Sequence, residues 1–132
     1  PQGFPESEYL KEKLESVMEK VNTGELLKDD KETANLQAEF DSILKAIETF
    51  NVDCKNEDLK SELAPWLHSL KDIVSGAKAI IESVIAIQEK DTNTAWVKFA
   101  AAGKHGIHIR PQKVKQQWQK QEVNVCIHSF HL

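Results

Sequence analysis

Residues 73–87 read IVSGAKAIIESVIAI, the most apolar run of the chain. Its apolar positions cover far more than one stripe of a helix, which is the pattern of a helix surrounded by other helices. Ser75, Lys78, Glu82 and Ser83 interrupt the run, so it is too short and too polar to span a membrane. We therefore expect residues 73–87 to form the central and most buried helix of a bundle.

Two amphipathic stretches precede this central run. The first predicts a helix from Ser7 to about Val21, and the second a helix from about Asp30 to Phe50, because their apolar residues recur at spacings of three and four. Residues 25–31 lie between them and are expected to form a short turn. The apolar positions are Leu10, Leu14, Val17, Met18 and Val21 in the first stretch, and Leu36, Phe40, Ile43, Leu44, Ile47 and Phe50 in the second.

A third helix is expected to begin at Asn56, a residue type that caps helix N-termini. Pro65 lacks a backbone donor and disfavours helical backbone just before it, so we expect a kink or a break there. Gly76 costs about 1 kcal/mol relative to Ala and would permit a close crossing of two helices. Trp66 and Trp96 are expected in the core. The apolar stripe comprises Leu59, Leu63, Trp66, Leu67, Leu70, Ile73 and Val74.

The remaining residues predict a fourth helix, a short fifth one and a tail. Residues 91–94, DTNT, are rich in capping types and lead into a helix that should stop near Gly103. Pro111 suits the first position of a fifth helix, and residues 123–130 are expected to be extended. The predicted fold is all-α: one domain over residues 1–132, a bundle of four to five helices with a C-terminal extended tail.

The chain contains two cysteines, Cys54 and Cys126, the minimum for one disulfide. We expect them to pair and to pin the tail to the bundle, closing a loop for which the chain-entropy model gives roughly 4 kcal/mol. The alternative is two buried thiols in a cytosolic protein. The sequence begins at Pro1 without a basic region followed by an apolar one, which leaves a secreted origin open.

Charge is divided unevenly along the chain. Residues 1–91 contain eleven Lys and twenty Asp or Glu, a net charge of −9, whereas residues 92–132 contain six Lys or Arg and one Glu, a net charge of +5. The basic part could meet an acidic surface on another protein or pack on the acidic helices of its own chain. Nucleic acid is a poorer partner, because only one of these cations is Arg and the protein is acidic overall. The candidate binding residues are Lys104, Arg110, Lys113, Lys115, Trp118 and Lys120.

No catalytic, metal or cofactor motif is visible. The chain lacks a nucleophile elbow, a phosphate loop and a zinc signature, so we expect no enzymatic activity, no cofactor and no metal. Cys126 with His128 is a weak pattern for thiol chemistry. The pairs His105 with His108 and His128 with His131 could reach a zinc ion, but they lack an accompanying Glu or Cys, and we expect these histidines to be solvated.

Residues 99–118, FAAAGKHGIHIRPQKVKQQW, followed by Cys126 and preceded by an acidic helical body, resemble the small salivary proteins of anopheline mosquitoes of the anophensin and albicin kind. The resemblance concerns size, helical layout and the arrangement of charge. It implies a secreted helical protein that interferes with a host defence cascade, either the alternative complement convertase or the contact system of kallikrein and kinin. It transfers no functional residue to this chain.

These observations favour a secreted, extracellular protein that acts by binding a host protein, a complement or contact-system component. No membrane or nucleic-acid partner is expected. One alternative is a carrier in which the bundle encloses a small apolar ligand. Another is an intracellular helical adaptor domain.

Overall fold

The computed structural model describes residues 7–107, and every regular element among them is helical. This confirms the predicted fold class. The predicted fifth helix, the extended tail and Cys126 lie outside the described residues. The elements are α1 (Ser7–Thr23), the short 3₁₀ helix η1 (Glu25–Lys28), α2 (Asp30–Asp53), α3 (Glu57–Gln88) and α4 (Thr92–Gly103).

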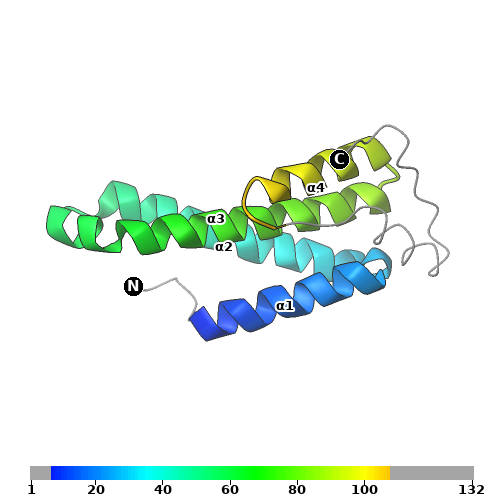
Figure 1. Ribbon diagram of the computed structural model, residues 1–132, viewed down its shortest axis with the longest axis horizontal. Helices are drawn as coiled ribbons and strands as arrows, with labels where there is room; N and C mark the ends of the chain where they lie inside the picture. The colour runs from blue at the N-terminus through cyan, green and yellow to red at the C-terminus, as the bar shows by residue number, and fades with distance from the viewer. Residues whose placement is uncertain (1–6, 108–132) are drawn as a thin grey trace.

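The helix α3 is the centre of the arrangement, as its sequence predicts. It packs along α2 to form a long antiparallel hairpin, and α4 folds back onto its C-terminal half (Figure 1). The helix α1 runs beside the hairpin, with its backbone farther from α3 than those of α2 and α4. The end of the hairpin where α2 meets α3 projects past both α1 and α4 (Figure 1).

The core follows the apolar periodicity of each helix. Phe40 of α2, Ile80 and Val84 of α3, and Trp96 of α4 are all inaccessible to solvent or nearly so. Trp96 is 1% exposed, and its ring centroid lies 5.1 Å from that of Phe99, which confirms the prediction for this tryptophan. Burial of each such large side chain contributes about 1.5–3 kcal/mol of hydrophobic stabilisation, so the α2–α3–α4 core dominates the stability of the bundle.

The helix starts follow the capping residues of the sequence. The predicted starts at Asn56 and around Asp91 are confirmed, because each of these side chains accepts a hydrogen bond from a backbone N–H in the first turn of its helix. The helix α2 begins in the same way. The three bonds are Glu32 N to Asp29 Oδ1 at 2.9 Å, Leu59 N to Asn56 Oδ1 at 3.1 Å and Thr94 N to Asp91 Oδ1 at 3.2 Å.

The turn predicted at residues 25–31 is the 3₁₀ helix η1, and a partly buried polar cluster joins it to the bundle. Gln88 Nε2 at the end of α3 donates to the backbone oxygen of Leu26, at 2.9 Å. Its Oε1 accepts from Thr33 Oγ1 on α2, at 3.1 Å, and the same hydroxyl also bonds the oxygen of Asp30. The backbone oxygen of the buried Leu26 therefore accepts a hydrogen bond from the end of α3, in keeping with the rule that buried polar groups are paired.

Of the kink or break expected at Pro65, the break is wrong, because α3 continues through this residue as one helix. In a helix the nitrogen at position 65 would bond the carbonyl of Ser61, and both residues are exposed, so solvent can hydrate that carbonyl. The expected burial of Trp66 is also wrong, since its side chain is 36% exposed. Both residues belong to the N-terminal half of α3, whereas α4 folds onto its C-terminal half (Figure 1).

Candidate functional site

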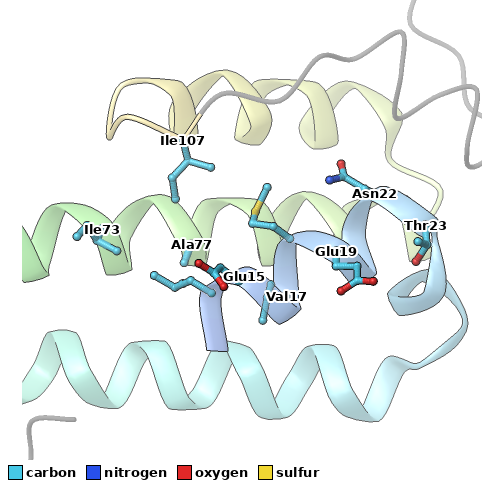
Figure 2. A pocket seen from close by; sticks show the side chains of 10 residues that line it. Glu15, Val17, Glu19, Asn22, Thr23, Ile73, Ala77 and Ile107 are labelled. Atoms are coloured by element: carbon cyan, nitrogen blue, oxygen red, sulfur yellow. The ribbon is translucent and has the colours of Figure 1, made fainter. Parts of the chain in front are cut away.

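An apolar pocket of about 530 Å³ opens between α1, α3 and the turn that follows α4 (Figure 2). Leu14 and Met18 lie one turn apart on α1, while Ile73 and Ala77 lie one turn apart on α3. Ile107 points toward the pocket from the turn after α4 (Figure 2). The remaining lining residues are Glu15, Val17, Glu19, Asn22 and Thr23.

The turn after α4 is held against α3 at Gly76. A Cβ atom added at Gly76 would lie 2.8 Å from Ile107 Cδ1 and 3.1 Å from His105 Cβ, so the turn needs a glycine there. The sequence predicts that Gly76 permits a close crossing of two helices, and this is wrong in one respect, because the close neighbour of Gly76 is a turn. Gly106 lies in the same turn and has a φ of 87°, a left-handed backbone conformation that glycine adopts readily.

His105 is partly exposed, as expected for a solvated histidine, but it also makes a hydrogen bond that the sequence did not predict. Its Nδ1 is 2.6 Å from Oδ1 of Asp72 on α3, and both side chains are partly exposed. The bond joins the turn after α4 to α3 one turn away from Gly76. Within residues 7–107 no cluster of His, Cys, Asp or Glu could hold a metal ion, and His108, His128 and His131 lie outside that range.

The charged side chains that line the pocket are both acidic. Glu15 and Glu19 are exposed residues one turn apart on α1. The other side of α1 is tied to α2, because Lys13 Nζ lies 2.7 Å from Glu39 Oε2. The hydrogen bond to Glu39 raises the pKa of Lys13 above its usual value. The acidic edge of the pocket is therefore not neutralised by that lysine, which is already paired.

The structure describes one of the six residues that the sequence predicts to bind a partner. Lys104 is exposed in the turn after α4. Cys54 is partly buried at the connection between α2 and α3, and has no disulfide partner among the described residues. Its predicted partner Cys126 lies outside the described residues, as do Arg110, Lys113, Lys115, Trp118 and Lys120.

An exposed apolar surface that the sequence does not predict runs along α3. Leu59, Trp66 and Ile73 are expected in the core as part of one apolar stripe, but they are 39%, 36% and 40% exposed. Their spacing of seven residues puts them on one face of the helix, which we call the exposed stripe. This spacing was visible in the sequence, and it separates them from Leu67, Leu70 and Val74, which are buried.

None of the helices within residues 7–107 is both long enough and apolar enough to cross a bilayer. Comparison with known proteins yields a match to one family, described as hyaluronidase post-catalytic domain-like, over residues 9–121. No curated protein and no solved structure matches the chain. The family match includes most of the chain, from the start of α1 to well beyond the turn after α4. The chain therefore belongs to the hyaluronidase post-catalytic domain-like family.

Proposed function

We propose that this chain is a non-catalytic accessory domain that docks on a protein partner through the projecting half of the α2–α3 hairpin. The observation that supports this most directly is the exposure of Leu59 and Trp66, two large apolar side chains on one face of α3. Exposed apolar residues that line up beyond the packed body of a domain are typical of binding surfaces. Tryptophan is also the residue type most enriched among strong contributors to binding energy.

The family description suggests the class of partner. It refers to a domain that follows a catalytic domain in hyaluronidase-like proteins, so a hyaluronidase-type catalytic domain is the partner we propose. The chain itself would do no chemistry. Glycoside hydrolysis ordinarily needs a carboxylic acid whose pKa a buried setting raises, whereas Glu15 and Glu19 at the pocket are exposed to solvent.

Binding measurements with a hyaluronidase-type catalytic domain from the same source test this proposal. Trp66→Ser and Leu59→Ser should each raise the Kd about tenfold or more, because loss of a side chain that is buried in the interface costs about 2 kcal/mol of binding free energy. Val97→Ser is the matched control, since Val97 is 62% exposed on α4, away from the exposed stripe. An unchanged Kd in both stripe variants would refute the docking surface. Hydrolysis of hyaluronan by the purified chain alone would refute the non-catalytic role.

The pocket favours a second candidate, a carrier of a small apolar ligand. Its volume of about 530 Å³ and its aliphatic lining match those of small-molecule sites in proteins. Native mass spectrometry of the protein from its natural source should then reveal a bound apolar molecule. Met18→Trp would fill the pocket and should release this molecule while the helix content stays the same.

A third candidate follows from the resemblance to mosquito salivary proteins, a secreted inhibitor of a complement or contact-system protein. The exposed Lys104 is the described residue that favours it. In this case Lys113→Glu, Lys115→Glu and Lys120→Glu together should weaken binding to a host plasma protein, identified by mass spectrometry after capture from plasma. Unchanged capture of that protein would remove the basic residues from the interface.

A further inference from the structure

We propose that the apolar pocket between α1 and α3 is covered by residues 108–121 of this same chain, which we call the C-terminal segment. The segment would place its apolar side chains against α1 and α3, and its lysines and arginine beside Glu15 and Glu19. This inference goes beyond the proposed docking function, which concerns the other end of the molecule. It rests on where the described chain ends, on the extent of the family match and on charge.

The residue that precedes the C-terminal segment, Ile107, lies at the pocket. Ile107 lines the pocket and is anchored there, because its side chain lies in the space that Gly76 leaves open. The backbone is fixed as well, since Ile107 N donates to the oxygen of Ala102 at 3.1 Å. His105, two residues earlier, is paired with Asp72 at 2.6 Å. The last described residue before the C-terminal segment is therefore fixed beside α1 and α3.

The family match supports a place for this segment within the domain. The match runs to residue 121, fourteen residues past the end of the described helical body, so the segment belongs to the same matching unit. The C-terminal segment is also long enough to extend along the pocket. Trp118 is eleven residues after Ile107, which spans about 16 Å as a helix or about 36 Å when extended. The pocket lies along α1, which is only about 25 Å long.

The composition of the segment complements the pocket. Its sequence, HIRPQKVKQQWQKQ, contains four Lys or Arg and no Asp or Glu, whereas the charged residues of the pocket are Glu15 and Glu19. Trp118 alone could bury about 150–250 Å² of apolar surface. The pocket offers a matching surface, because Ile73 is exposed there while Leu14 and Met18 are only partly buried. Opposite charges would then set the register of the segment on α1.

The single methionine of the chain provides a direct test, since Met18 lines the pocket. In full-length protein with a ¹³C-labelled methionine methyl group, we expect nuclear Overhauser contacts from the Met18 methyl to an indole ring. Trp118→Phe should remove these contacts, whereas the control Trp66→Phe should leave them, because Trp66 is not among the pocket residues. Absence of indole contacts, or their persistence in Trp118→Phe, would overturn the proposal.

Oxidation of Met18 by peroxide gives an independent measurement on the folded chain. If the segment covers the pocket, the thioether of Met18 should oxidise several-fold more slowly than a free methionine amide. Lys113→Glu with Lys115→Glu should accelerate the reaction, and adding Glu15→Lys and Glu19→Lys should slow it again. Equal rates in wild type and the Lys→Glu variant would refute the proposal. The proposal would also be refuted if the pocket held one apolar ligand per chain. It would equally be refuted if the nuclear Overhauser contacts to Met18 appeared only between differently labelled copies of the chain.

Discussion

Gly76 illustrates how one residue can determine where a distant segment lies. It sits inside α3, where glycine costs about 1 kcal/mol relative to alanine, yet its missing side chain is the space that Ile107 occupies. The nearby hydrogen bond between His105 and Asp72 holds the same turn. A helix position that is locally unfavourable is thus explained by a contact thirty-one residues away in the sequence.

We predict that Gly76→Ala lowers the free energy of unfolding by about 1 kcal/mol, because overpacking costs about 1–3 kcal/mol and better helix propensity offsets about 1 kcal/mol of it. In an Ile107→Ala background the same change should be neutral or stabilising, since the closest contact, 2.8 Å to Ile107 Cδ1, is then gone. Urea unfolding of the four proteins measures both effects. Equal costs in the two backgrounds would contradict this account.

The helices of the bundle begin where their capping residues predict. At the start of α4, the hydrogen bonds of the cap also change the pKa of the capping carboxyl of Asp91. Hydrogen bonds from Thr94, first from its side chain and then from its backbone N–H, lower the pKa of Asp91 below its usual value. A carboxyl whose pKa is lowered in the folded state adds stability above the unfolded pKa. That stability is lost as the pH falls through the folded value.

We therefore predict that Asp91→Asn, which keeps a capping side chain but cannot ionise, reduces the thermal midpoint at neutral pH. The gap between wild type and this variant should close as the pH is lowered through and below the usual range of aspartate, about 3.9. Thermal unfolding followed by circular dichroism at several pH values measures the gap. Asp58→Asn is a suitable control, because Asp58 is an exposed acidic residue in the first turn of α3 and not its N-cap. A gap that is independent of pH would show that ionisation of Asp91 does not stabilise α4.

Within residues 7–107, α1 and α4 run along only part of the long α2–α3 hairpin. The helices α1 and α4 have 17 and 12 residues, whereas α3 has 32. The body around α4 is therefore a closed core, while the hairpin end exposes Leu59 and Trp66. Cys54 lies at the end of the hairpin where α2 meets α3, and it remains the predicted disulfide partner of Cys126.

We predict that the purified protein contains a disulfide between Cys54 and Cys126, and that its reduction lowers the free energy of unfolding by roughly 4 kcal/mol. Peptide mapping without reductant should identify one linked peptide, and the intact mass should be lower by two hydrogen atoms than that of the reduced chain. Cys54→Ser should abolish the link and match the stability of the reduced protein. Two free thiols in protein purified without reductant would refute the pairing.

The helical class, the central place of α3 and the helix starts at Asn56 and Asp91 could all be predicted from the amino-acid sequence. These features are local, because apolar periodicity and capping depend on residues within a few positions of each other. By contrast, the continuation of α3 through Pro65, the exposure of Trp66 and the hydrogen bond between His105 and Asp72 could be seen only once the helices were placed in space. The reason is that each of these depends on where a neighbouring helix ends, and this is set by contacts between segments far apart in the chain.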